Sequence, residues 1–166
     1  MVELLKQDYE NNCKFFLELK NHLIKLFNQE ITIHHVGSTA IPDMVGKNIV
    51  DILIGVENET EMDSFSNILK DNGYFQGQNT TPIYRFFAST INETKSGDLH
   101  IHLVTKNTER YNEFLLLKEF LLNNKEERDN YCSLKKEILS KTTDRNEYRK
   151  LKSEYVSNLI ARAKQN

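Results

Sequence analysis

The sequence contains few cysteines and prolines and no long apolar run. Its two cysteines, Cys13 and Cys132, lie far apart in stretches with helical patterns, so we expect reduced thiols and no disulfide. Its two prolines, Pro42 and Pro82, fall at a loop and at a strand start, and no repeat, low-complexity segment or linker is found. The longest apolar runs, such as ILIGV, are far too short to cross a bilayer, so no membrane partner is expected. The opening stretch MVELLKQDYENN has acids where a secretion signal needs basic and then apolar residues, so we expect a cytoplasmic protein.

Charge is distributed unevenly along the chain. The formal net charge of −2 argues weakly against binding to long nucleic acid. Residues 1–105 contain 8 Lys and Arg against 14 Asp and Glu, whereas residues 106–166 contain 14 against 10. A basic C-terminal half could attract a phosphate-bearing ligand towards a site formed mainly by the N-terminal half. Alternatively, these lysines only keep long surface helices soluble.

Hydrophobic periodicity predicts an α+β fold. Helices are expected over residues 3–28, 57–72, 107–122, 124–141 and 144–163, and strands over residues 31–36, 48–56, 82–90 and 98–105. The last two strands should pair as an antiparallel hairpin across INETKSG, whose Ser96-Gly97 favours a turn. This order predicts a small mixed or antiparallel sheet with flanking helices and a C-terminal helical segment. We expect one domain over residues 1–166, in which helices of residues 107–166 pack on a core formed by residues 1–106.

A possible phosphate-binding turn follows the strand at residues 31–36. Gly37, Ser38 and Thr39 would expose backbone N–H groups and two hydroxyls, which can hold phosphate oxygens. The same tripeptide also forms ordinary turns at strand ends, so it is weak evidence alone.

The next strand contains an aspartate among apolar residues. Asp51 lies within NIVDILIGV, where an unpaired carboxylate would be costly to bury. It therefore needs a metal ion, several hydrogen bonds or a basic partner, for which Lys47 and Arg85 are candidates.

Four of the five histidines occur in two pairs, His34-His35 and His100 with His102. Residues two apart on a strand point to the same face, so His100 and His102 should lie side by side. With Asp51 as an oxygen ligand they could hold Zn²⁺ or Mn²⁺. Alternatively, the two rings form a partly exposed polar face with no ligand.

The string HHVGSTAIP…KNIVDILIGV resembles the signature of the GrpB family, which reads close to H-[IV]-G-S-T-[AS]-[IV]-P…K-x-I-[IV]-D-I-L-[IV]. Similarity extends over nearly the whole chain. RFF at residues 85–87 and HIHLV at residues 100–104 resemble two of the family's strands. NYCSLKKEI is similar to its Y-x-x-L-K helix, and DRNEYRKLKSEYV to its last helix, with Lys152 at the family's lysine.

The resemblance implies a fold similar to the polymerase-beta-like nucleotidyltransferases. In that superfamily a Gly-Ser holds phosphates, two carboxylates on the next strand bind paired Mg²⁺ ions, and a third lies on a later strand. Gly37, Ser38 and Asp51 match this pattern, but Leu53 occupies the position of the second carboxylate. The later strand offers His100 and His102 in place of an acid.

Imidazole is a poor ligand for Mg²⁺, and a single carboxylate cannot hold the second ion of a two-metal site. Either another divalent metal is used or basic side chains neutralise the phosphates. Basic residues at family positions, which we take as candidate phosphate ligands, are Lys47, Arg85, Lys118 and Lys152.

The leading hypothesis is therefore a protein that binds a nucleotide or another phosphate-bearing small molecule. If it is an enzyme, nucleotidyl transfer to a small acceptor is expected, with Asp51 holding a metal (Mg²⁺, Mn²⁺ or Zn²⁺) and His100 or His102 acting as ligand or general base. A non-catalytic binding module that lost its acids is the main alternative, supported by Leu53. Hydrolase-like chemistry at a His/His/Asp metal site is a third.

Overall fold

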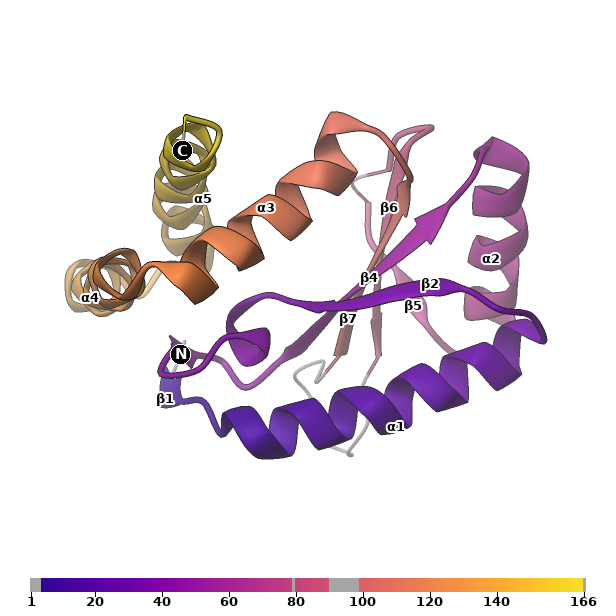
Figure 1. The fold of residues 1–166 in the computed structure, drawn as a ribbon, viewed down its shortest axis with the longest axis horizontal. Coiled ribbons are helices and arrows are strands. Elements are labelled where there is room, and N and C mark those ends of the chain that lie inside the picture. The colour runs from indigo at the N-terminus through magenta and orange to yellow at the C-terminus, as the bar shows by residue number, and fades with distance from the viewer. Residues whose placement is uncertain (1–3, 79, 90–98, 166) are drawn as a thin grey trace.

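The computed structural model describes residues 4–78, 80–89 and 99–165, in which helices surround a mixed sheet (Figure 1). The sheet has the order β2-β4-β7-β6-β5. Its strands are Thr32–Val36, Val50–Val56, Leu99–Thr105, Tyr84–Ser89 and Phe75–Gln76, in that order. The central strands β4 and β7 are parallel, and each other neighbouring pair is antiparallel. The expected α+β class with a small mixed sheet is confirmed.

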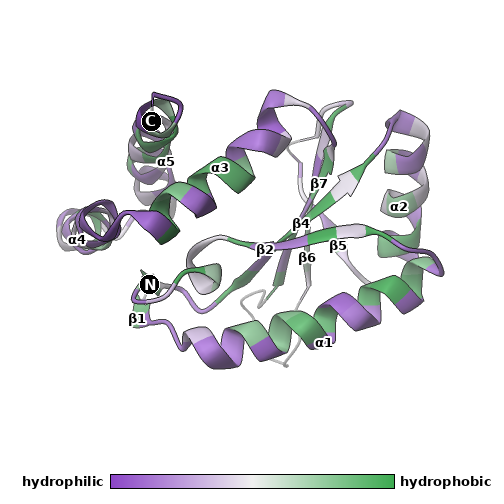
Figure 2. Cartoon of the chain, in the orientation of Figure 1, coloured by the Kyte–Doolittle hydropathy of each residue, from purple (hydrophilic) through white to green (hydrophobic). Residues whose placement is uncertain are grey.

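Helices cover both faces of the sheet. The helices α1 (Tyr9–Phe27) and α2 (Glu59–Asp71) pack on one face, and α3 (Glu109–Asn123) lies on the other. The last helices, α4 (Lys125–Lys141) and α5 (Arg145–Ala163), stand beside α3 and away from the sheet (Figure 1). Figure 2 shows the central strands as largely hydrophobic and α4 as largely hydrophilic.

The alternation of side chains along β4 and β7 divides the sheet into two unlike faces. Towards α1 and α2, both strands present aliphatic residues that form the main core: Val50, Ile52, Ile54, Val56, Leu99, Ile101 and Leu103. Towards α3, the same strands present Asp51, Leu53, His100, His102 and Val104, as the β4–β7 register requires. The sheet thus places the polar residues of both strands on one face.

A separate apolar cluster joins the C-terminal helices to the segment after β2. It contains the buried residues Ile41, Met44, Leu121, Tyr131, Cys132 and Leu159. This packing brings α4 and α5 against the turn that follows β2.

The element ends agree with the expected ones in most places. Thr108 and Asp144 cap α3 and α5, and β6 pairs with β7 in the expected antiparallel sense. The expected helix over 3–28 begins only at Tyr9, because the Asp8 side chain caps it by accepting a hydrogen bond from the Asn11 N–H.

Three short strands were not expected. The two residues of β1 (Leu5–Lys6) pair with β3 (Val45–Gly46), and β5 lies at the edge of the main sheet. The INETKSG turn and Thr90 lie outside the described residues. Within the described part of the chain, no helix has the length and apolar character needed to cross a membrane.

Candidate functional site

The Gly37–Ser38 turn lies directly against Asp51. Val36, the last residue of β2, is opposite Asp51 in the β2–β4 register. Gly37 has φ 73° and ψ −171°, a region open essentially to glycine alone. A Cβ at Gly37 would lie 2.3 Å from Asp51 Oδ2. Glycine therefore permits both the backbone conformation and the close approach of the carboxylate.

Asp51 and the two histidines form one hydrogen-bonded cluster. Asp51 Oδ1 lies 3.1 Å from His100 Nδ1 and 3.4 Å from His102 Nε2. An ionised carboxylate only accepts hydrogen bonds, so both ring nitrogens donate. Burial alone would raise the pKa of Asp51, but these hydrogen bonds and the charge that the rings can carry hold the pKa well below its usual value. Asp51 is thus an anion whose side chain is still one-quarter exposed.

Tyr84 extends this cluster on the neighbouring strand β6. Its hydroxyl lies 3.0 Å from His102 Nδ1. When Nε2 of a neutral His102 donates to Asp51, Nδ1 must accept from the Tyr84 hydroxyl. Phe114 of α3 packs against the His102 ring at 4.7 Å between centroids, and the Arg110 guanidinium lies 5.0 Å from the Phe114 ring. The ring of His102 is therefore held by two hydrogen bonds and by aromatic packing.

Asp51, His100 and His102 are not arranged to bind the metal ion that was expected there. Both imidazoles are directed at one oxygen of Asp51 and not at a common centre beside it. Among the described residues, no group of three or more His, Cys, Asp or Glu is arranged to hold a metal ion.

Leu53, at the position of the missing second carboxylate, belongs to the hydrophobic core. Its side chain is 0% exposed and clusters with Val36, Val104 and Tyr111 beneath α3. An acid at this position would lose its hydration without gaining a partner. Leucine at this position therefore contributes to the packing of α3 on the sheet.

Lys135, in α4, is a residue that the sequence prediction missed. It is 2% exposed, and its ammonium donates to Ser38 Oγ and to the Val45 carbonyl, both at 2.7 Å. The ammonium also lies 4.3 Å from the centre of the Tyr131 ring. Burial, and next the nearby charge of Lys152, lower the pKa of Lys135 to about 7. The Y-x-x-L-K match ends at this lysine, but nothing in the sequence places α4 beside the Gly-Ser turn.

One of the predicted phosphate ligands lies near Lys135, and a second contacts α5. Lys152 of α5 is close enough to act on it electrostatically. The Lys47 ammonium lies 5.0 Å from the centre of the ring of Tyr148, also in α5. Ser38 therefore contacts one basic residue of α4, and a basic residue of α5 lies near that one.

Three other predicted ligands make contacts with other parts of the fold. Arg85 faces α2, on the side of the sheet opposite Asp51, where it pairs with Asp63 and donates to Ser66 Oγ at 2.8 Å. Its neighbour Phe86, not Arg85, is opposite His102 in the β6–β7 register.

Lys118 and Thr39 both form hydrogen bonds with His35 of β2. The Lys118 ammonium donates to the carbonyl of His35 in this edge strand at 2.9 Å. Thr39 is buried, with its hydroxyl 2.9 Å from His35 Nε2. His35 itself stacks on Phe16 of α1, and burial lowers its pKa to about 4, so it is a neutral structural residue at neutral pH.

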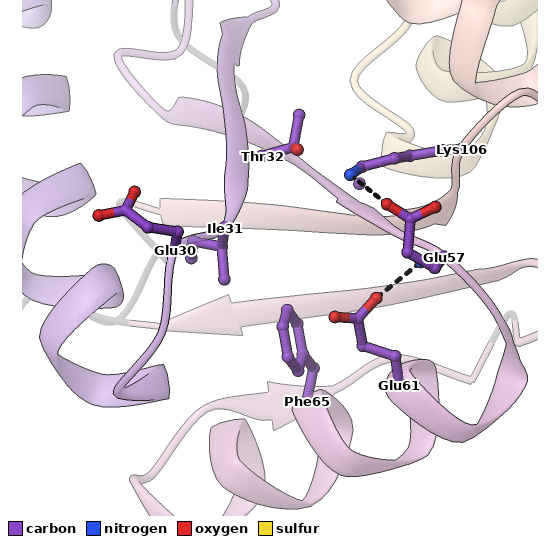
Figure 3. Close-up of a pocket in the computed structure, with 8 residues that line it drawn as sticks. Glu30, Ile31, Thr32, Glu57, Glu61, Phe65 and Lys106 are labelled. Carbon is purple, nitrogen blue, oxygen red and sulfur yellow. Dashed lines mark hydrogen bonds and ion pairs between the residues drawn. The ribbon is translucent and has the colours of Figure 1, made fainter.

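A shallow hollow of about 340 Å³ lies at the other end of β2 and β4 (Figure 3). It is lined by Glu30, Ile31, Thr32, Gly55, Glu57, Glu61, Phe65 and Lys106. Its glutamates outnumber its one lysine, which donates to Glu57 at 2.6 Å. The hollow is thus distinct from the Ser38 site and opposite to it in charge.

Comparison with known proteins places the chain among relatives of similar sequence. YqkA of Bacillus subtilis, described as a UPF0157 protein, is 33% identical over 114 residues, which are 68% of this chain and 32% of that protein. Glutamate-rich protein GrpB of Alkalihalophilus pseudofirmus is 30% identical over 121 residues, which are 69% of this chain and 68% of that protein. UPF0157 protein SCO7215 of Streptomyces coelicolor is 24% identical, and the match covers 62% of it. The chain thus spans about a third of YqkA and less than two-thirds of SCO7215.

The fold has a counterpart among solved structures. The crystal structure of the conserved protein GrpB from Enterococcus faecalis matches with a TM-score of 0.83 at 20% identity, over 97% of this chain and 96% of that one. The Cid1 poly(U) polymerase matches with a TM-score of only 0.47 at 13% identity, over 70% of this chain and 42% of that one. The family model described as GrpB protein matches residues 2–162, so this chain belongs to the GrpB family.

Proposed function

We propose that this protein binds a phosphate-bearing small molecule, with a nucleotide as the first candidate, at the Gly37–Ser38 turn. The observation that supports this most is the 2.7 Å contact between the buried ammonium of Lys135 and Ser38 Oγ. A phosphoryl oxygen beside Ser38 would meet a hydroxyl and a fixed ammonium together, and charge-assisted hydrogen bonds of this kind are the strong ones.

The charge around the turn also favours an anion. Lys135 and Lys152 lie close enough for the charge of one to disfavour the charge of the other, and an anion between them would relieve this repulsion. The nearby carboxylate of Asp51 is directed at His100 and His102, whose ring nitrogens donate hydrogen bonds to its Oδ1. The choice of a nucleotide comes from the resemblance of the Gly-Ser and Asp51 strands to the nucleotidyltransferase pattern.

The proposal can be tested by calorimetry and by thermal shift. Nucleoside mono- and triphosphates, pyrophosphate and inorganic phosphate would be titrated into the wild type, Lys135→Met and Lys136→Met. Methionine keeps the length and apolar stem of lysine, and Lys136 is the exposed neighbour in α4, so it is the matched control. Loss of a charged hydrogen bond, about 1.5–3 kcal/mol, should weaken binding in Lys135→Met by about tenfold or more. If no ligand binds, or if both variants weaken binding equally, the proposal is wrong.

Nucleotidyl transfer is the second candidate, supported by the exposed part of the Asp51–His100–His102 cluster. With Nδ1 of His100 donating to Asp51, its Nε2 can accept a proton from an acceptor hydroxyl that attacks the α-phosphate, while pyrophosphate leaves beside Lys135.

Pyrophosphate release would be measured with each triphosphate and candidate acceptor, with Mg²⁺, Mn²⁺, Zn²⁺ and no added metal. Release that is lost in Asp51→Asn supports transfer. Binding without release supports the non-catalytic module, which the packing of Leu53 favours.

A further inference from the structure

We infer that the site takes its phosphate ligand without a divalent metal ion, and that Lys135 provides the positive charge that a metal provides in a two-metal site. This inference rests on the proposed function and narrows the ligand class. It points to a nucleoside monophosphate or another phosphate monoester, and not to a triphosphate that enters with Mg²⁺.

The first observation is that the strand of Asp51 cannot supply a second metal ligand. Leu53 points to the same face as Asp51 and fills the core beneath α3. Its polar neighbours in register, His34 and His102, already have partners. His34 Nε2 lies 2.9 Å from the Tyr111 hydroxyl, and His102 bonds to Asp51 and Tyr84.

The second observation is the crowding around the carboxylate of Asp51. Oδ1 accepts from His100 and His102. Oδ2 lies so close to Gly37 that a Cβ there would be 2.3 Å from it. An ion bound through Oδ1 would therefore have to displace a histidine, and β4 offers no second carboxylate beside Asp51.

The third observation is the fixed place of Lys135. Two of its three N–H donors are held by Ser38 Oγ and the Val45 carbonyl, and the described residues offer no hydrogen-bond partner for the third. The aliphatic part of the Lys135 side chain is buried, so its ammonium cannot move into solvent as the ammonium of a surface lysine can. Lys152 lies close enough to act on this ammonium electrostatically, so a second basic side chain lies near the site.

The experiment is calorimetric titration of AMP, GMP, CMP, UMP and inorganic phosphate at constant ionic strength. One set uses buffer passed over chelating resin, and the others contain excess Mg²⁺, Mn²⁺ or Zn²⁺. Resin replaces EDTA because EDTA is itself an anion that could occupy the site. We expect the same affinity in metal-free buffer as with metal, and a loss of about tenfold or more in Lys135→Met in both media.

A second variant tests whether the position of Leu53 on β4 can supply a metal ligand. If the position of Leu53 were a vacant metal ligand, Leu53→Asp would gain metal-dependent binding. We expect Leu53→Asp to lose folding stability, measured by circular dichroism. We also expect it to gain no metal-dependent binding, measured by calorimetry on the folded fraction. Gained binding would overturn the inference.

The outcomes separate the two proposals. Binding that requires a metal overturns this inference and leaves the proposed function intact. Unchanged metal-free binding in Lys135→Met also overturns it, because another group then supplies the charge. Absence of binding in every medium overturns the proposed function, and this inference with it.

Discussion

Gly37→Ala is the sharpest test of the contact between the turn and Asp51. The φ and ψ of Gly37 (73° and −171°) are essentially closed to alanine, which costs about 1–3 kcal/mol. The new Cβ would lie 2.3 Å from Asp51 Oδ2, so the carboxylate must move and weaken its hydrogen bonds, at about 0.5–1.5 kcal/mol each. We expect a loss of about 2–4 kcal/mol in the free energy of unfolding. For a chain of this size the melting temperature should fall by roughly 4–16 °C.

Urea denaturation followed by circular dichroism measures this loss, and the chain provides a matched control. Gly73 also has a positive φ of +83°, but nothing lies within 4 Å of the position of its Cβ. Gly73→Ala should therefore show backbone strain alone. Repeating both changes in an Asp51→Ala background completes a double-mutant cycle. The cost of Gly37→Ala should shrink there by about 1 kcal/mol or more, while that of Gly73→Ala should not. Equal costs for the two glycines, or no coupling to Asp51, would refute the geometry.

Arg85→Ala should lower the free energy of unfolding by about 1–3 kcal/mol in urea denaturation, because it removes the contacts of Arg85 with α2. Phosphate binding, measured by calorimetry, should not change. Weaker binding would contradict the position of Arg85 on the face opposite Asp51. Sulfate keeps its charge with pH, so its affinity should fall by up to about tenfold per pH unit above about 7 as Lys135 loses its proton. The residual binding of Lys135→Met should lack this fall, and an identical profile would count against Lys135. Tyr84→Phe should remove the hydrogen bond to Nδ1 of His102 and shift its ¹⁵N resonance, measured by NMR, while an unchanged resonance would exclude that bond.

The longer elements could be predicted because their periodicity is strong. The aliphatic run of β4 and the cap at Asp144 are local signals, and both correspond to observed elements. The strands β1, β3 and β5 contain two residues each, too few for any period to be recognised. Their formation depends on chain segments brought together by the packing of larger elements.

In the candidate site, too, the residues that follow a local pattern could be predicted and those that depend on long-range packing could not. The turn at Ser38, Asp51 and the two histidines could be predicted to meet, because they lie on neighbouring strands and residues two apart share a face. Arg85 was misplaced because a one-residue change in register moves a side chain to the other face, and the sequence does not fix the register. Lys135 was missed because its contact with Ser38 joins residues 97 apart in the chain.

On the proposed function, Leu53 and Lys135 have linked roles, because Leu53 leaves no second metal ligand on β4 and Lys135 supplies a cation beside Ser38. In the superfamily implied by the resemblance, three carboxylates with two Mg²⁺ ions leave a net charge of about +1 for the phosphates. Here the positive charge near Asp51 comes from Lys135, whose pKa is about 7, and from Lys152. A lysine fixed in α4 does not dissociate, but it neither acidifies a bound water nor clamps the attacking and leaving oxygens as paired metals do. On the proposed function, the arrangement can hold a phosphate but lacks much of the means of transferring it. Saturable binding without pyrophosphate release is therefore the result that this geometry favours.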